Sequence, residues 1–241
     1  MTNQSNYRAD IDGLRALSVL SVILFHLGWQ ALPGGFIGVD VFFVISGFLI
    51  TRLIKHEFEH RQTFDFKNFY MRRARRLFPA FYFMLIICFI FSFISFTPAH
   101  LERFSGALIH SILGLSNFFF WMESGYFSAS SEFKPLLHTW SLGVEEQFYL
   151  FWPILLVTIL SKLSKARVLV FLISTFLLSL LVNIIVANEE VIFSSFEHVF
   201  QDKNSFLFFL TPFRIFEFSL GASIVWLINF RPSSNFLLES F

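Results

Sequence analysis

Charged residues are scarce in this chain, and so is cysteine. Only 15% of the 241 residues are Asp, Glu, Lys or Arg, whereas an ordinary soluble domain carries about 25%. The single Cys excludes a disulfide framework and a thiolate metal site. The formal net charge of +1 provides no overall field that would attract nucleic acid. These shortages exclude a soluble domain, a disulfide-stapled secreted fold and a nucleic-acid-binding protein.

Apolar residues dominate the rest of the sequence. They make up 55% of the chain, 38 residues are Phe, and the mean hydropathy is +0.65. A helix needs about 20 mainly apolar residues to cross a bilayer, and the apolar runs are continuous rather than alternating as in a barrel. The sequence therefore predicts an all-α polytopic membrane bundle with about seven membrane helices. The expected spans are Leu14–Gln30, Phe36–Thr51, Leu77–Pro98, Phe104–Met122, Leu142–Ser161, Val168–Asn188 and Phe206–Phe230.

The charges near the N-terminus predict its orientation. Arg8, Asp10 and Asp12 precede the first apolar run and no small-residue cleavage site follows it, so a cleaved signal is not expected. One of the two aspartates is expected to cap the first helix. The loop Lys55–Arg76 holds seven Lys or Arg against three Asp or Glu. By the positive-inside rule this loop and the N-terminus are cytoplasmic.

The stretch Phe104–Met122 leaves the later topology open. If it crosses fully, the basic loop around Lys162 falls outside and the acidic segment 188–205 falls inside. If it is re-entrant, both loops obey the positive-inside rule. The sequence does not decide between these two arrangements.

Ionisable residues inside apolar runs are the first candidates for function, because each costs a few kcal/mol at membrane depth. Arg15 and His26 are eleven residues apart, which on a helix places them within about 20° of one face and about 16 Å apart along the axis. The pair predicts a path from the cytoplasmic face inward, ending at a side chain that exchanges protons near neutral pH. The alternative for His26 is a packed core histidine.

Four arginines form a basic cluster just before the third expected span. One interpretation is that the cluster only fixes the orientation of the following span in the membrane. The functional one is a phosphate clamp, because guanidinium groups bind phosphate oxygens in a bidentate manner. Lysine would anchor equally well, so an all-arginine cluster favours recognition slightly. The four residues are Arg72, Arg73, Arg75 and Arg76.

The remaining buried charges have structural explanations available. Glu145 could simply favour a helix N-terminus. Arg214 and Glu217 are spaced i,i+3 and are expected to pair with each other. Asp40 has no oppositely charged neighbour in sequence, so its partner must come from another helix. Cys88 is expected to be inert packing, and no motif for a metal site is present.

Six ordered segments carry a resemblance to a known family. Together they resemble the acyltransferase 3 family of bacterial inner-membrane O-acyltransferases, which modify surface polysaccharides. The segments are Tyr7–Leu17, Phe25–His26, Gly34–Ile50, Arg72–Pro79, Pro135–Tyr149 and Thr211–Glu217.

The resemblance implies the reaction and its participants. An acyl group, usually acetyl, would move from cytoplasmic acyl-coenzyme A to a hydroxyl of a surface polysaccharide, such as lipopolysaccharide, or of its lipid-linked precursor. Acyl-coenzyme A would be a donor substrate and not a permanently bound cofactor. The expected location is the bacterial inner membrane, with membrane lipid around the helices. A carrier or flippase for a lipid-linked sugar, or an inactive scaffold, is the alternative.

The resemblance also implies residue roles. The family's arginine–ten residues–histidine motif falls on Arg15 and His26, which would be catalytic, with His26 acting as general base or as acyl carrier. The arginine motif places the donor's phosphates against Arg72, Arg73, Arg75 and Arg76. Supporting roles fall to Asp40, Glu145, Arg214 and Glu217.

The family's membrane domain has more helices than the seven predicted here. Residues 1–241 are therefore expected to form the front part of an acyltransferase 3 membrane domain that is incomplete at its C-terminus. No SGNH-type domain is present in these residues.

Overall fold

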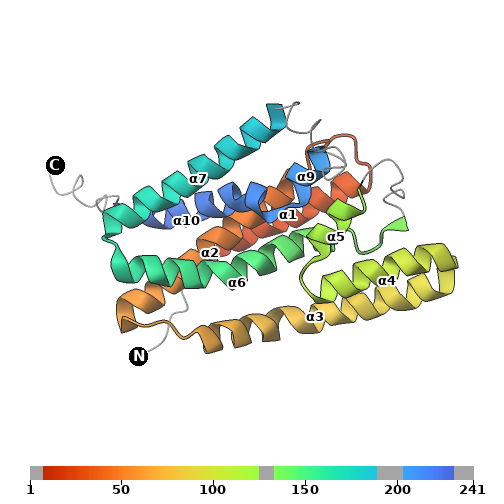
Figure 1. Ribbon diagram of the computed structural model, residues 1–241, viewed down its shortest axis with the longest axis horizontal. Helices are drawn as coiled ribbons and strands as arrows, with labels where there is room; N and C mark the ends of the chain where they lie inside the picture. Colours follow the sequence, from red (N-terminus) through yellow and green to blue (C-terminus); the bar gives the residue numbers. More distant parts are fainter. Residues whose placement is uncertain (1–7, 125–132, 189–202, 231–241) are drawn as a thin grey trace.

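The structure is a computed structural model that describes residues 8–124, 133–188 and 203–230. Within these ranges the chain is helical without strands, as predicted. The helices form an elongated bundle (Figure 1). Their bounds are α1 Ala9–His26, α2 Ile37–Arg61, α3 Phe66–Ser95, α4 Pro98–Ile112, α5 Ser116–Met122, α6 Thr139–Lys162, α7 Lys165–Asn188, α9 Lys203–Phe209, the 3₁₀ turn η2 Thr211–Arg214, and α10 Ile215–Phe230.

Local chemistry sets where the first helices begin and end. Neither of the two aspartates near the N-terminus caps α1: Asp10 instead accepts hydrogen bonds from Arg8, the residue before the helix. Gln62 ends α2 in a left-handed conformation at φ 57°. The Asp65 side chain caps α3 by accepting a hydrogen bond from the Asn68 backbone N–H at 2.9 Å.

The prediction that Lys55–Arg76 forms a loop is wrong, although the excess of basic residues in this segment stands. Only residues 62–65 lie outside helices. Hydropathy marks the membrane-embedded part of a helix, whereas the helix itself continues until a cap ends it. The arginine cluster of α3 therefore lies on a helix and not in a loop.

The bundle is centred on the close packing of α2 against α10. Gly47 and Gly221 make this approach possible: a Cβ atom on Gly47 would lie 2.1 Å from the Phe218 carbonyl oxygen, and one on Gly221 would lie 1.9 Å from that of Val44. Aromatic rings continue the core outward. Phe218 stacks on Phe43 with centroids 4.8 Å apart and on Phe148 with centroids 4.1 Å apart.

Among the described residues, five segments are long and apolar enough to cross a membrane: α2, α3, α6, α7 and Thr211–Ile228. The expected count of about seven is therefore not confirmed. Helix α1 is apolar, but its 18 residues include Asp10, Asp12 and Arg15. The stretch Phe104–Met122 is divided between α4 and α5 by Gly114, which has φ 68°.

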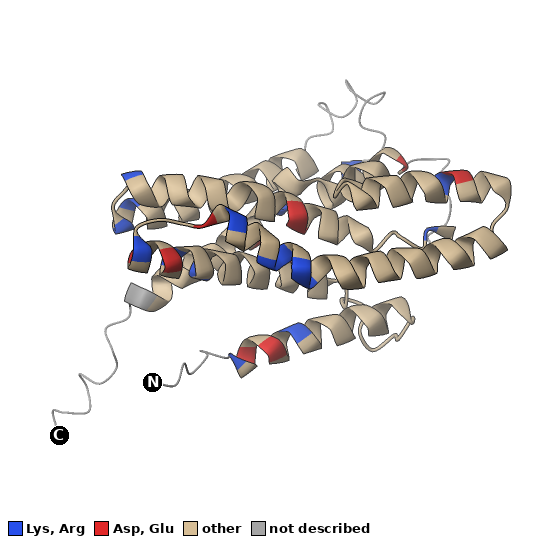
Figure 2. Ribbon diagram, turned by 90° about the horizontal axis from the view of Figure 1, so that it is seen from below, with Lys and Arg blue, Asp and Glu red and all other residues tan. Residues whose placement is uncertain are grey.

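Because Phe104–Met122 is divided between two helices, it does not form one continuous crossing helix, and the path of the chain is the one that the re-entrant arrangement predicts. Helix α4 runs back beside α3, and the chain then turns through α5 towards α6 (Figure 1). The α2–α3 and α6–α7 connections consequently lie at one end of the bundle, where basic residues gather (Figure 2). This arrangement satisfies the positive-inside rule for both connections.

Helices α3 and α7 expose large apolar side chains. Phe83 and Phe91 of α3 are 65% and 68% exposed, and Leu178 of α7 is 63% exposed. Such surfaces are unfavourable in water but match the hydrocarbon of a bilayer. The exposed faces of these helices thus agree with a multi-pass membrane protein.

Candidate functional site

Helix α1 carries both residues of the predicted catalytic pair. His26 is its last residue and is exposed, and its Nδ1 lies 2.8 Å from the Val22 carbonyl oxygen. Because a carbonyl oxygen only accepts, Nδ1 carries the hydrogen and donates it. In the neutral ring Nε2 then holds the free lone pair, so this nitrogen is the one able to take up a proton.

Arg15 is turned more towards the bundle than His26. It is half-buried, and its Nη1 lies 3.7 Å from Oδ1 of Asp12. Arg15 also interacts electrostatically with Glu145 on α6. Helix α1 thus carries Arg15 near the half-buried Glu145 carboxylate and His26 at its exposed end.

His138, the residue before α6, is an ionisable neighbour of His26. The pKa of His138 is lowered, first because packing withdraws water from its ring and second because a protonated His26 would repel its charge. The two imidazoles therefore lie within electrostatic range of each other. Sequence analysis overlooked His138, although it belongs to a segment that carries the family resemblance.

The four arginines of α3 do not act as one cluster. Arg72 is exposed and has a distant ion pair with Glu57, with 3.9 Å between Nη2 and Oε2. Arg75 and Arg76 are exposed. Arg73 alone is half-buried, with its guanidinium carbon 4.1 Å from the centre of the Tyr149 ring on α6. On α3, Arg72, Arg75 and Arg76 are spaced i, i+3 and i+4 and share an exposed face, whereas Arg73 is offset from that face and meets Tyr149.

Glu145 anchors a polar network below Arg73. The Ser46 hydroxyl donates to Glu145 Oε1 at 2.8 Å, and the Tyr149 hydroxyl lies 2.9 Å from Ser46 Oγ and 3.3 Å from Glu145 Oε2. Arg73 interacts electrostatically with this carboxylate. Glu145 is therefore more than a helix-terminal charge, since it joins α2, α6 and α3.

Ser46 and Tyr149 were missed by the sequence analysis. Neither side chain is ionised in a membrane. Candidates were selected from the sequence as ionisable residues within apolar runs, and this criterion does not select Ser or Tyr. The one available signal was the position of Ser46 and Tyr149 within the resembling segments Gly34–Ile50 and Pro135–Tyr149. For brevity, Arg73, Glu145, Tyr149 and Ser46 are called the Arg73 cluster.

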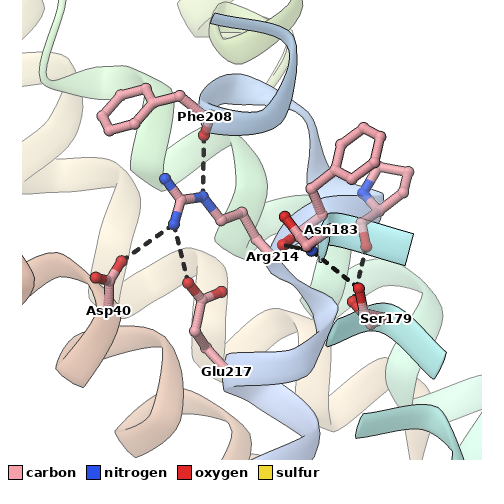
Figure 3. A network of polar contacts seen from close by, with 8 residues as sticks. Asp40, Ser179, Asn183, Phe208, Arg214 and Glu217 are labelled. Carbon is pink, nitrogen blue, oxygen red and sulfur yellow. Dashed lines mark hydrogen bonds and ion pairs between the residues drawn. The ribbon is translucent and has the colours of Figure 1, made fainter. Parts of the chain in front are cut away.

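A second group of charges lies where α2, η2 and α10 meet, and is called the Arg214 cluster (Figure 3). Arg214 Nη1 lies 3.2 Å from Asp40 Oδ1 and 3.0 Å from Glu217 Oε1. The expected i,i+3 pair is confirmed, and so is the expectation that Asp40 finds its partner on another element. Arg214 Nε also donates to the Phe208 carbonyl oxygen at 3.0 Å.

The surroundings hold the Arg214 cluster in place. The guanidinium carbon lies 5.5 Å from the centre of the Trp140 ring and 5.0 Å from that of Phe208. Helix α7 fixes η2 from the other side, because Ser179 and Asn183 donate hydrogen bonds to two η2 carbonyl groups, at 3.0 and 2.8 Å (Figure 3). The cluster is thus a closed junction between α2, α6, α7, α9 and α10.

The two clusters offer different chemistry. The Arg73 cluster presents a half-buried cation without an ion pair among the described residues, and its Glu145 also interacts with Arg15 on α1, the helix that ends at His26. Such an arrangement can bind an anionic group and remove a proton from a hydroxyl. In the described parts of the chain, no group of three or more His, Cys, Asp or Glu could hold a metal ion.

Comparison with known proteins assigns residues 8–227 to a family model described as an acyltransferase domain. The peptidoglycan O-acetyltransferase OatA of Listeria monocytogenes is 43% identical over 164 residues, which are 68% of this chain and 26% of that protein. The putative peptidoglycan O-acetyltransferase YrhL of Bacillus subtilis is 36% identical over 238 residues, or 97% of this chain and 36% of that protein.

The O-acetyltransferase OatA of Staphylococcus aureus is 34% identical over 221 residues, covering 92% of this chain and 35% of that protein. No solved structure matches the chain. Across these three relatives, the matched region is between 26% and 36% of the length of the curated protein.

Proposed function

The chain belongs to the acyltransferase 3 family, and we propose that it transfers an acetyl group from acetyl-coenzyme A to a hydroxyl of a cell-wall polysaccharide. The relatives are named for peptidoglycan O-acetylation, so peptidoglycan or its lipid-linked precursor replaces lipopolysaccharide as the acceptor we favour. The bacterial cytoplasmic membrane is the proposed location. The observation that supports this function best is the half-buried Arg73, which has no ion pair among the described residues and interacts with the same Glu145 carboxylate as Arg15 on the helix of His26.

The donor is proposed to bind from the basic end of the bundle. Coenzyme A is a polyanion, and the exposed Arg72, Arg75 and Arg76 are suited to its phosphates. Arg73 lies deeper, over the Tyr149 ring. The narrow pantetheine arm would extend from these arginines along α1, which spans about 16 Å between Arg15 and His26.

His26 is proposed to carry out the proton transfer. Its Nε2 takes the proton of the acceptor hydroxyl while that oxygen attacks the thioester carbonyl carbon. The C–S bond breaks, and the proton passes to the departing thiolate of coenzyme A. An acyl-imidazole on the same nitrogen is the second route, and it differs by a covalent intermediate.

The test uses membranes from cells that express the protein, supplied with acetyl-labelled acetyl-coenzyme A. Wild-type membranes should place label on peptidoglycan hydroxyls, and His26→Gln should reduce the rate by about 100-fold or more. His60→Gln is the matched control, because His60 is also exposed and its Nδ1 lies 2.8 Å from the carbonyl oxygen of the residue four positions earlier. His60→Gln should retain the wild-type rate.

Two results would contradict the proposal. Transfer by His26→Gln at the wild-type rate would remove His26 from the reaction. The absence of labelled polysaccharide with the wild-type protein, while lipid-linked sugar still crosses the membrane, would favour the carrier instead.

A further inference from the structure

The Arg214 cluster contains more negative than positive groups. One guanidinium faces two carboxyl groups, and a single nitrogen, Nη1, serves both of them. The Nε donor is already used by the Phe208 carbonyl oxygen. If both carboxyl groups were ionised, the cluster would hold one uncompensated negative charge.

Burial makes such a charge costly. The side chain of Glu217 is 3% exposed and that of Arg214 is 13% exposed, whereas Asp40 is 34% exposed. Glu217 Oε2 is buried and accepts no hydrogen bond from the described residues. A buried carboxylate oxygen without a donor is strongly disfavoured, and protonation removes that cost.

Among the residues that the structure describes, the neighbouring elements supply polar and aromatic groups rather than a second cation. The charged groups that act on Glu217 are Arg214 and Asp40. Helix α6 contributes the Trp140 ring and α9 contributes the Phe208 ring and carbonyl. Helix α7 directs Ser179 and Asn183 at backbone carbonyl groups of η2.

The two carboxyl groups contact the same nitrogen of Arg214 and are therefore immediate neighbours. Two ionised carboxylates cannot hydrogen-bond to each other, because both are acceptors only. One proton between them supplies the missing donor, as in other carboxyl pairs that share a site. We infer that the Arg214 cluster is a binding site for one proton, carried on Glu217 Oε2 and shared with Asp40.

A metal cation is a poorer occupant than a proton. The guanidinium nitrogen lies within 3.2 Å of an oxygen of each carboxyl group and would repel a second cation. With the proton bound, the cluster is neutral and ties the start of α2 to η2, α9 and α10. Without the proton, two carboxylates would compete for one guanidinium at this junction.

Infrared spectroscopy of the protein in lipid nanodiscs tests the site directly. At neutral pH the wild-type protein should show the carbonyl stretch of a protonated carboxylic acid, and Glu217→Gln should lack it. Glu59→Gln is the control, because Glu59 is exposed and has one ion-pair partner, Lys165. Its band should match that of the wild type. Absence of the band in the wild type would overturn the proposal.

Asp40→Asn tests whether the proton is shared. In that variant one carboxylate remains for one guanidinium, so Glu217 should ionise and its carbonyl band should disappear. Persistence of the band in Asp40→Asn would overturn the shared site, because burial alone would then keep Glu217 protonated.

Thermal unfolding at different pH values provides a second measurement. A proton bound by the folded protein but not by the unfolded chain stabilises at low pH, and this contribution is lost as pH rises. The midpoint of wild-type unfolding should therefore fall with rising pH, and that of Glu217→Gln should fall less. A wild-type midpoint that depends on Na⁺ at constant pH, and not on pH, would identify a cation site and contradict the proposal.

Discussion

Arg214 and Arg73 are both turned into the helical bundle, yet they meet carboxyl groups in different ways. Arg214 is 13% exposed and lies within 3.2 Å of two carboxylate oxygens. Arg73 is half-buried and has no ion pair within 4 Å among the described residues, although it interacts electrostatically with Glu145. The guanidinium of Arg73 instead lies on the ring of Tyr149.

The difference separates a structural arginine from one that is available to a ligand. Two of the nitrogens of Arg214 serve partners within the protein, so an incoming anion would have to displace Asp40, Glu217 or the Phe208 carbonyl. Arg73 is positioned by a ring, which fixes the plane of the guanidinium and leaves N–H donors at its edge. Glu145 is held by Ser46 and Tyr149 and does not form an ion pair with Arg73.

Replacing Arg214, the cation of the Arg214 cluster, should have the largest effect on stability. Arg214→Met leaves the carboxyl groups of Asp40 and Glu217 buried without a counter-charge, which should cost about 3–5 kcal/mol of folding free energy. Thermal unfolding in detergent and the yield of folded protein measure this loss. Arg73→Met is the matched control, and it should cost about 1 kcal/mol or less because no ion pair is broken.

A triple variant separates loss of charge balance from loss of packing. Asp40→Asn, Arg214→Met and Glu217→Gln together remove all three charges, and most of the stability should return. If Arg214→Met alone were as stable as Arg73→Met, the proposed difference between the Arg214 cluster, whose charges are paired, and the Arg73 cluster, whose arginine is available to a ligand, would be contradicted.

Substitution in the Arg73 cluster should weaken binding of the acyl donor and leave the stability of the protein nearly unchanged. Arg73→Lys keeps the charge but loses the planar guanidinium with its bidentate donors, so the KM for acetyl-coenzyme A should rise by about tenfold. Steady-state kinetics in membranes measure KM and kcat separately. Arg61→Lys, at an exposed arginine outside the cluster, should change neither. An unchanged KM in Arg73→Lys would make Arg73 a structural residue as well.

Parts of this comparison could be predicted from the sequence. The i,i+3 spacing predicted the Arg214–Glu217 pair, because a local spacing needs no knowledge of the fold, although the structure divides the two residues between η2 and α10. Arg15 and His26 lie on one helix, as their spacing predicted. The partner of Asp40 could be expected but not identified, since Arg214 lies 174 positions away in the chain. The separate roles of the α3 arginines were not predictable, because packing of Tyr149 from α6 selects Arg73 among them.

The errors in the predicted fold have a common physical cause. Hydropathy identifies the part of a helix that suits a bilayer, but helix ends are decided by capping groups and glycines. The caps at Gln62 and Asp65 extended two helices into a predicted loop. Gly114 divided one apolar stretch into two short helices. Counting apolar stretches therefore gave a larger number of spans than the five found among the described residues.

The smallest effect is expected for the Arg8–Asp10 pair, which lies outside the predicted spans. Arg8 donates from Nε to Asp10 Oδ1 at 2.8 Å, a shorter contact than either ion pair of Arg214. This hydrogen bond lowers the pKa of the Asp10 carboxyl to about 2. The two side chains are 43% and 58% exposed, so water and salt screen the attraction and compete for both partners.

The sign of any contribution from Asp10 follows from its lowered pKa. A stabilising effect would be present above pH 4 and would be lost as the pH falls towards 2. We expect Asp10→Asn to leave the thermal midpoint at pH 7 unchanged within error, at both low and high salt, and to remain indistinguishable from the wild type at pH 3. A loss at pH 7 comparable to that of Arg214→Met would mean that contact distance, and not burial and charge balance, determines what these arginine pairs contribute.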